Sequence, residues 1–322
     1  MRKHLYLLYA IPGAILMTAG LASISAAETA VRPVVPGTGI RIEELGDDFE
    51  DADWEWNHNW PKSSQNLNDV ANKPTGESEN GRWYEGIKRG HPDYIKRVPT
   101  PEGGLPGSEG SLLLRSLYTG VPYKPSYRQQ QDDFVLDVMY NLHGAIPVDR
   151  TPSVVARVFL PPVDKWENRT GCHFAFRCAL DTTVREVSRG LFATESLKSE
   201  IFYPGMFIDF EAKEQSGRDY DTASIRIRGN EKDNDYTAKQ VEVTGWWTMG
   251  ISVTPDGRVH FYARPGIEDL TPRDRIASHM AQGYRAENFR SAFFNVVNGD
   301  DGKTWSTEWI VDDTMVYVVK KL

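Results

Sequence analysis

The chain has 322 residues, of which 40% are hydrophobic and 25% carry a charge. Its 45 acidic residues outnumber its 37 basic ones, which gives a formal net charge of −8 at pH 7. This balance argues against nucleic acid as a partner, because phosphate backbones are bound by clustered lysine and arginine. The length is ample for one large hydrophobic core.

Residues 1–27 have the features of an export signal. A basic start with Arg2 and Lys3 precedes an apolar run over residues 5–22, and small residues end the segment at Ala27. An uncleaved membrane anchor is the alternative, because the apolar run approaches the length of a bilayer span. No later apolar run is long enough for such a span. We therefore expect a secreted protein, or one of the periplasm or cell envelope.

The rest of the chain predicts a linker followed by one domain. Residues 28–44 are rich in Pro and Gly and indicate the linker, and residues 45–322 form the predicted domain. Between residues 54 and 110, regular periodicity is scarce and Asn, Pro, Gly and Trp are frequent, which indicates long N-terminal loops.

From residue 111 onwards, short β-branched and aromatic runs alternate with Pro and Gly signals, a pattern typical of a sandwich or barrel. The predicted strands cover residues 111–116, 133–140, 153–160, 171–180, 206–212, 223–228, 240–253, 258–263, 293–297 and 309–319. The sequence therefore predicts an all-β fold with at most one or two short helices.

Two local signals are specific enough to predict a turn and a helix. Pro255, Asp256 and Gly257 supply the fixed and the positive φ angles of a tight turn, so residues 251–262 predict a hairpin. Residues 271–281 predict a short helix, with Thr271 as the cap and a proline in the first turn.

The only cysteines, Cys172 and Cys178, have the same parity in one predicted strand with Phe174 and Phe176. In a continuous strand they lie about 20 Å apart, far beyond the reach of a disulfide. Two buried free thiols are the expectation. If the segment folds back on itself instead, an oxidising compartment could join them.

Acidic and aromatic residues mark both the start and the end of the predicted domain, in residues 47–51 and 309–313. These segments suggest first and last strands that lie side by side. Asp48, Glu50, Asp312 and Asp313 would then supply hard oxygen ligands for Ca²⁺, with backbone carbonyls completing the shell. Alternatively, the acids only flank edge strands and block unwanted pairing.

Three predicted strands alternate apolar and polar side chains. Their polar members are Asp209 and Glu211 on the first strand, Arg226 and Arg228 on the second, and His260, Tyr262 and Arg264 on the third. If these strands are neighbours, the polar members form one surface that could bind an acidic sugar through bidentate arginine contacts. The alternative is a solvated face with cross-strand ion pairs.

Tryptophan offers a second route to sugar binding. Trp54, Trp56 and Trp60 lie close together, and Trp83 follows in the same loop-rich region. Their flat faces could cover the apolar side of a pyranose, or the rings could instead fill the end of the core.

The overall pattern resembles the concanavalin A-like lectin and glucanase superfamily. The likeness rests on residues 47–51, 107–114, 246–262 and 309–313. It implies a two-sheet antiparallel jelly-roll β-sandwich, a curved face that often holds a glycan, and a structural Ca²⁺ near the paired terminal strands. The retaining glucanases of glycoside hydrolase family 16 carry a Glu-x-Asp-x-Glu strand motif. Here Phe207 stands in the place of its nucleophile, ahead of Asp209 and Glu211.

The resulting expectation is an exported carbohydrate-binding β-sandwich that recognises a polysaccharide. One alternative is an enzyme on the same scaffold. As a glycoside hydrolase it would use Asp209 and Glu211, and as a polysaccharide lyase it would use His260 and Tyr262 with the arginines. A second alternative is a structural protein of the cell envelope.

Overall fold

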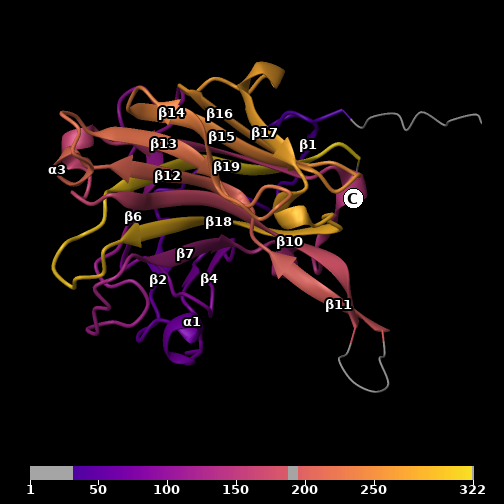
Figure 1. Ribbon diagram of the computed structural model, residues 1–322, viewed down its shortest axis with the longest axis horizontal. Helices are drawn as coiled ribbons and strands as arrows, with labels where there is room; N and C mark the ends of the chain where they lie inside the picture. The colour runs from indigo at the N-terminus through magenta and orange to yellow at the C-terminus, as the bar shows by residue number, and fades with distance from the viewer. Residues whose placement is uncertain (1–31, 188–194, 321–322) are drawn as a thin grey trace, which may run out of the picture. The chain divides into compact units, whose positions relative to one another are not determined.

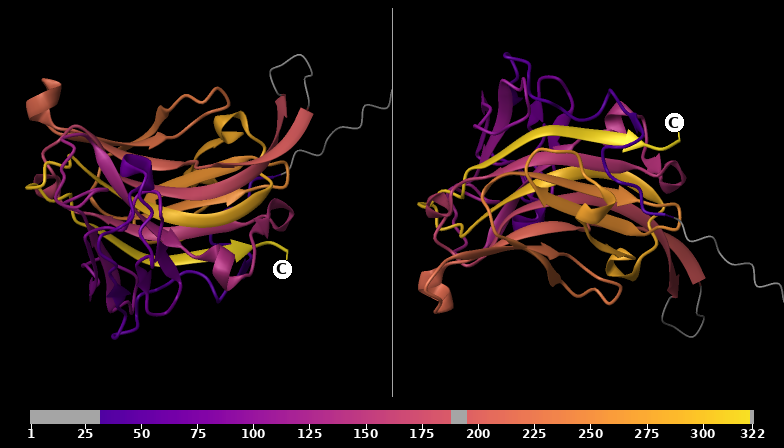
Figure 2. Two further views of the ribbon diagram at one scale, coloured as in Figure 1. Left: turned by 90° about the horizontal axis from the view of Figure 1, so that it is seen from below. Right: turned by 90° about the horizontal axis from the view of Figure 1, so that it is seen from above.

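In the computed structural model, which describes residues 32–187 and 195–320, two antiparallel β-sheets face each other across one core. Figure 2 shows these sheets as curved layers. This arrangement confirms the predicted all-β, two-sheet sandwich and is consistent with a jelly roll. The predicted export signal lies outside the described residues.

Within the described residues, one sheet has eight strands and the other has eleven. The eight-stranded sheet contains β1 (Ile40–Arg41), β5 (Tyr94–Pro99), β6 (Gly110–Arg115), β9 (Ser153–Leu160), β15 (Gly245–Val253), β16 (Val259–Pro265), β17 (Arg275–His279) and β19 (Trp309–Val318). The eleven-stranded sheet contains β2 (Trp56–Asn57), β3 (Glu77–Ser78), β4 (Trp83–Glu85), β7 (Gln130–Leu136), β8 (Ile146–Pro147), β10 (Gly171–Val187), β11 (Glu195–Phe202), β12 (Gly205–Glu211), β13 (Thr222–Ile227), β14 (Tyr236–Val241) and β18 (Asn288–Asn298).

Helices are short in the described residues. The α-helical turns are α1 (Gln65–Asn68), α2 (Val138–Asn141) and α3 (Lys213–Ser216), and the 3-10 turns are η1 (Val148–Arg150), η2 (Val163–Lys165), η3 (Pro272–Asp274) and η4 (Ala281–Gly283). The sequence predicts at most one or two short helices, and the described residues contain three short α-helical turns. In the part of the chain described, no helix has the length and apolar character of a membrane span.

Alternating side chains explain why these segments pair as a sandwich. In β13, Ala223, Ile225 and Ile227 are buried while their neighbours are half-buried, so one face of the strand packs into the core. Aromatic rings dominate the core; Phe174 and Phe294, for example, stack with their centroids 5.6 Å apart. The order β12, β10, β18, β7 in the middle of the larger sheet can be followed in Figure 1.

The two ends of the domain meet, as the sequence predicts. Asp47 and Thr314 exchange backbone hydrogen bonds of 2.8 and 2.9 Å, and β1 pairs antiparallel with β19. Part of the predicted linker also contacts the domain. The Ser252 hydroxyl donates to the carbonyl of Val34 at 2.6 Å, so the later part of the predicted linker packs on the domain.

The predicted hairpin is confirmed, and the predicted helix is wrong beyond its first turn. Strands β15 and β16 pair across a turn in which Gly257 has a φ of +82°. Thr271 does cap a helical segment, but that segment is the single 3-10 turn η3, and strand β17 begins directly after it. Pairing with β16 stabilises the extended conformation there, which is a tertiary effect that overrides local propensity.

Both cysteines are buried free thiols, which confirms the expectation. The prediction that both side chains lie on the same face of the strand is wrong, because the strand register shifts between Cys172 and Phe174. The extra residue places Cys172 on the outer face of the sheet beside Phe207, while Cys178 points into the main core.

Candidate functional site

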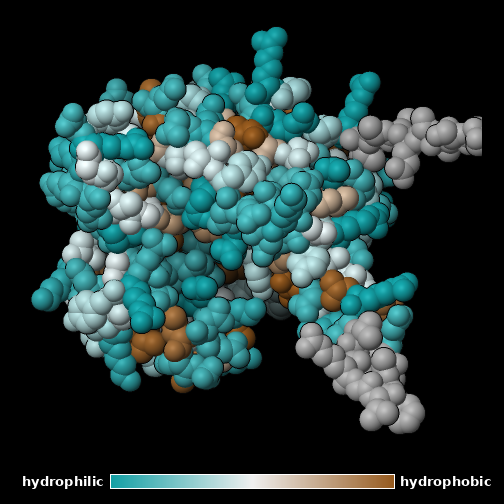
Figure 3. Space-filling view, in the orientation of Figure 1, coloured by the Kyte–Doolittle hydropathy of each residue, from teal (hydrophilic) through white to brown (hydrophobic). Residues whose placement is uncertain are grey.

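A groove crosses the outer face of the eleven-stranded sheet. Its floor comes from β7, β10 and β18, one wall from the segment around Lys88, and the other from the end of β11 with Tyr203. The groove has a volume of about 520 Å³, within the range of small-molecule sites. Figure 3 shows a hydrophilic recess in this region of the surface. We call this feature the cationic groove.

Positive charge gathers in the cationic groove, although the chain as a whole is negative. The basic lining residues are Lys88, Arg89, Arg177, Arg228 and Arg290. Asp133 is the only carboxylate among the lining residues. Arg290 is paired with Asp181 at 3.1 Å, but the lining as a whole has more basic than acidic side chains, which favours an anionic ligand.

Arg177 lies in the floor of the groove and is fixed by its neighbours. Its guanidinium donates to the carbonyl of Tyr203 at 2.8 Å and to Oδ1 of Asn295 at 3.2 Å. The amide of Asn295 in turn donates to Asp133 at 2.7 Å. The guanidinium also lies over the rings of Tyr203, Phe207 and Phe293, at 5.1–5.7 Å from their centroids.

Among the described residues, Arg177 differs from the other buried lysine and arginine side chains, Lys62 and Arg157, in lacking an acidic partner. Lys62 pairs with Asp132 at 2.7 Å, and Arg157 pairs with Asp313 at 2.5 Å. Arg177 is only 7% exposed, yet within the described residues no carboxylate forms an ion pair with it. Burial lowers its pKa to about 10, so the side chain stays charged at neutral pH. A buried cation without a partner is costly, and an anionic ligand would offset that cost.

Two other groups complete the groove. Burial raises the pKa of Tyr84 to about 12, so its hydroxyl is protonated at neutral pH and can donate a hydrogen bond. Burial also raises the pKa of Asp133, although Asn295 and Gln131 both donate to its carboxyl group. The groove thus combines basic side chains with a tyrosine hydroxyl and one buried acid that is held by two amide groups.

The groove continues past Arg228. A second cavity of about 220 Å³ shares Arg177, Tyr203 and Arg228 with the groove and extends to Gln282 and Tyr284. The two cavities meet side by side, so a ligand longer than one sugar ring could pass from one to the other.

The structure does bring Asp209, Arg226 and Arg228 to the same outer face, because β12 and β13 are neighbours. Asp209 is held by Arg226, whose Nε lies 2.5 Å from the carboxylate, and Arg226 also pairs with Asp235. Glu211 pairs with Arg218 at 3.1 Å. Of these predicted residues, Arg228 is the one that lines the cationic groove.

The predicted mixed surface does not extend to His260 and Tyr262, and this part of the prediction is wrong. Both lie on β16, which belongs to the opposite sheet, so β16 is no neighbour of β12 or β13. His260 is buried between the hydroxyls of Thr254 and Ser278, and burial lowers its pKa to about 4. Tyr262 is 1% exposed and packs in a small apolar cluster.

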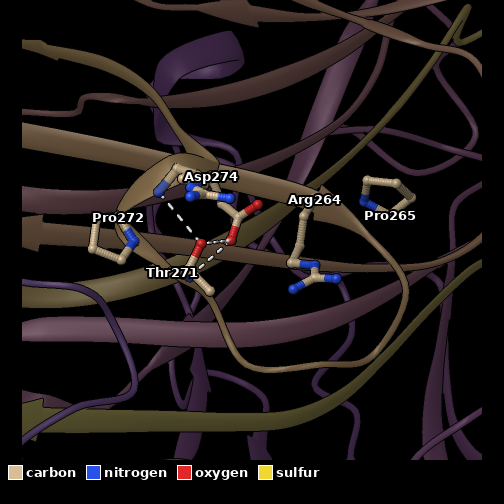
Figure 4. A pocket seen from close by; sticks show the side chains of 6 residues that line it. Arg264, Pro265, Thr271, Pro272 and Asp274 are labelled. Carbon is tan, nitrogen blue, oxygen red and sulfur yellow. Dashed lines mark hydrogen bonds between the residues drawn. The ribbon is translucent and has the colours of Figure 1, made fainter.

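Arg264 also lies apart from the groove. It borders a shallow depression formed by the loop that carries η3, where Asp274 accepts hydrogen bonds from Thr271 (Figure 4). Its own partner is Glu268 at 3.3 Å. It is therefore separate from Arg226 and Arg228.

The predicted tryptophan platform is not formed by Trp54, Trp56 and Trp83. All three are core residues, with exposures of 6%, 8% and 1%. Trp54 donates to Asp47 at 3.0 Å, and Trp83 stacks on Phe134 with the ring centroids 4.5 Å apart. These rings fill the end of the sandwich, which was the alternative interpretation.

The four predicted calcium ligands do not fit a common metal shell. Asp313 pairs with Arg157, Asp312 accepts hydrogen bonds from Ser108 and Ser111, and Glu50 accepts from the backbone N–H of Glu109. Asp48 is exposed. In the described residues no group of three or more acidic, His or Cys side chains converges as a metal site.

The main groove residues were missed in the sequence. Arg177 stands alone among the apolar residues of the stretch 174–180, and a single arginine in such a run is a signal for a buried charge. Asp133 and Asn295 gave no comparable signal, because their proximity depends on the pairing of β7 with β18.

No known family model matches the chain, and no curated protein matches it either. Similar solved structures include an alginate lyase from Klebsiella pneumoniae, with 9% identity, a TM-score of 0.38, and coverage of 84% of this chain and 95% of that chain. An alginate lyase from Pseudomonas aeruginosa has 8% identity, a TM-score of 0.38, and coverage of 71% and 87%. The catalytic domain of a GH131 β-glucanase from Podospora anserina has 10% identity, a TM-score of 0.39, and coverage of 71% and 80%.

Proposed function

We propose that this protein is an exported carbohydrate-binding β-sandwich whose cationic groove binds an acidic polysaccharide. The observation that carries the proposal is Arg177, a buried guanidinium with no carboxylate partner in the described residues, at the floor of a groove that five basic side chains line. Uronate or sulfate groups match the forked geometry of arginine. Tyr84 and Tyr203 add aromatic faces and hydroxyl groups for the sugar rings.

Binding is favoured over glycoside hydrolysis by the acids at the groove. Retaining hydrolysis needs two carboxyl groups about 5–5.5 Å apart, one to attack and one to protonate. The groove lining supplies one carboxylate, Asp133, and it is occupied by hydrogen bonds from Gln131 and Asn295. The predicted pair does not substitute for it, since Asp209 and Glu211 are each held by an arginine.

Affinity electrophoresis in gels that contain polygalacturonate, alginate or neutral dextran would test the proposal. We expect the acidic polymers to retard the wild-type protein and the Arg177→Met variant to lose at least tenfold in affinity, because a buried charged contact is worth about 2–5 kcal/mol. Arg177→Lys keeps the positive charge but cannot make the two parallel hydrogen bonds of a guanidinium group, so an intermediate affinity is expected. Arg185→Met is the matched control, because Arg185 is exposed on the β10–β11 ribbon.

Two results would contradict the proposal. One is equal retardation of the wild-type protein and the folded Arg177→Met variant in acidic gels. The other is the absence of retardation by every acidic polymer. Incubation with the same polymers, followed by assays for reducing ends and for unsaturated products, separates binding from catalysis.

A further inference from the structure

Trp60 is the one tryptophan that the fold leaves exposed. All nine tryptophans lie in the described part of the chain, and Trp60 alone reaches the exposed class, at 49%. Tyr123, from a loop distant in sequence, is 83% exposed, and Val70 is 43% exposed. Figure 3 shows apolar side chains at the surface around α1, whose Asn68 lines the same cavity as Trp60, Val70 and Tyr123.

These side chains surround a cavity of about 540 Å³, which we call the aromatic depression. Its walls are formed by Trp60, Val70, Val121, Pro122 and Tyr123. Its volume falls in the range of ligand pockets. The turn α1 separates it from the cationic groove, because Asn66 lines the groove while Asn68 lines the depression.

Trp60 is fixed by packing on its protein side. The ring of His58 stacks on it with centroids 5.9 Å apart and an interplanar angle of 11°, and the ring of His91 makes an edge contact at 5.2 Å. Burial lowers the pKa of His91 to about 4, and partial desolvation also lowers the pKa of His58. Trp60 thus presents its ring without having to be ordered by a ligand.

The loop of Tyr123 is fixed as well. The buried carboxylate of Asp300 accepts backbone hydrogen bonds from Thr119 at 3.2 Å and from Ser126 at 2.7 Å, at either side of the tyrosine. Tyr123 itself has a φ of +63°, a conformation that costs free energy in a bulky residue. The fold therefore holds an aromatic ring in solvent at a cost, which is typical of a binding site.

The charges of the depression differ from those of the groove. No carboxylate lines it, and the ammonium group of Lys62 is neutralised by Asp132 and Asp93. Lys124 is the remaining charged lining residue, and Asn68 and Asn72 add amide groups. A ligand that matches the aromatic walls and the amide groups has one apolar face and several hydroxyl groups.

We propose that the aromatic depression is a second carbohydrate site, which binds a neutral pyranose ring of a polysaccharide against Trp60 and Tyr123. This site is separate from the cationic groove and does not depend on the function proposed for it. The aromatic rings cover the apolar face of the sugar, and the amides at the rim bind its hydroxyl groups.

Affinity electrophoresis with galactomannan, xyloglucan and mixed-linkage β-glucan, all neutral, tests this proposal. We expect at least one polymer to retard the wild-type protein, with affinity about tenfold lower for Trp60→Ala and for Tyr123→Ala, as for an aromatic hot spot. Tyr220→Ala is the matched control, because Tyr220 is 65% exposed and lines neither cavity. Arg177→Met should bind the neutral polymers like the wild type, since Arg177 does not line the depression.

Acrylamide quenching of tryptophan fluorescence gives an independent measurement on the same proteins. The retarding polymer should reduce quenching in the wild type and have no such effect on Trp60→Phe, because Trp60 is the exposed tryptophan. The proposal is overturned if no neutral polymer retards the wild type, if Trp60→Ala binds as tightly as the wild type, or if Trp60→Ala weakens binding only to acidic polymers. Failure of the cationic groove would appear separately, in the Arg177 variants with acidic polymers.

Discussion

Arg177 and Asp133 lie in one hydrogen-bonded network but are joined through Asn295, whose amide donates to Asp133 at 2.7 Å and whose oxygen accepts from Arg177 at 3.2 Å. A neutral amide thus stands between the buried cation and the nearby acid. This separation leaves the charge of Arg177 available to a ligand instead of to the protein's own carboxylate.

Exchanging Asp133 and Asn295 should make the charge of Arg177 unavailable to a ligand. In the double variant Asp133→Asn, Asn295→Asp, the new carboxylate at position 295 contacts Arg177 directly. The hydrogen bond between positions 133 and 295 can still form, with the amide at position 133 as the donor. We expect affinity for acidic polysaccharides to fall about tenfold or more, because the ligand must now displace an internal ion pair. The free energy of unfolding should change little, since charge and volume are conserved. Unchanged affinity, measured by calorimetric titration, would show that Arg177 does not bind the ligand's charge.

Lys62 should be a major contributor to stability. Its ammonium group is fully buried and lies 2.7 Å from Asp132 and 3.0 Å from Asp93. Lys62→Ala leaves two carboxylates facing a buried site without their cation, so we expect a loss of about 3–5 kcal/mol in the free energy of unfolding. Urea unfolding followed by fluorescence measures the loss. Lys88→Ala, at an exposed site, is the control, with an expected change below about 0.5 kcal/mol.

Asp312 should make stability depend on pH. Burial raises its pKa from 3.8 to about 7, and only Ser108 and Ser111 hydroxyls and a backbone N–H support its charge. Ionising it therefore costs the folded state more than the unfolded chain. Its contribution to the free energy of unfolding should fall as pH rises from about 4 to about 7 and level off above, by an amount on the order of 2–4 kcal/mol.

The Asp312→Asn variant isolates this effect. Relative to the wild type, the variant should gain stability as pH increases across that window, as measured by urea unfolding at several pH values. Asp48→Asn, which changes an exposed aspartate, is the matched control. Parallel stability curves for the wild type and Asp312→Asn would contradict the prediction.

The two cysteines should be unreactive until the protein unfolds. Both thiols are buried, and burial raises the pKa of Cys172 to about 12 and raises that of Cys178 further. Titration with an aromatic disulfide reagent should detect no thiol in the native protein and both thiols in denaturant. A count of zero in denaturant without reductant would reveal a disulfide instead.

The sequence by itself determined most of the strands after residue 111, the hairpin at Gly257 and the burial of the thiols, and it suggested that the two ends meet. The strands and the hairpin follow from local patterns, because alternation fixes which side chains of a strand share a face and Pro-Asp-Gly fixes a turn. Trp60 shows the limit of such patterns. It is as aromatic as Trp54 and Trp56, yet only tertiary packing decides that it is exposed while they are buried.

The tertiary structure alone decided which strands are neighbours, and with that the site. Alternation says nothing about which sheet a strand joins, so His260 and Asp209 could share a periodicity and still lie on opposite sheets. The single extra residue after Cys172 exchanges the inward and outward faces within one strand, and nothing in the composition predicts this bulge. The cationic groove depends on such long-range pairing, because Arg177, Asp133 and Asn295 come together only when β10, β18 and β7 form adjacent strands.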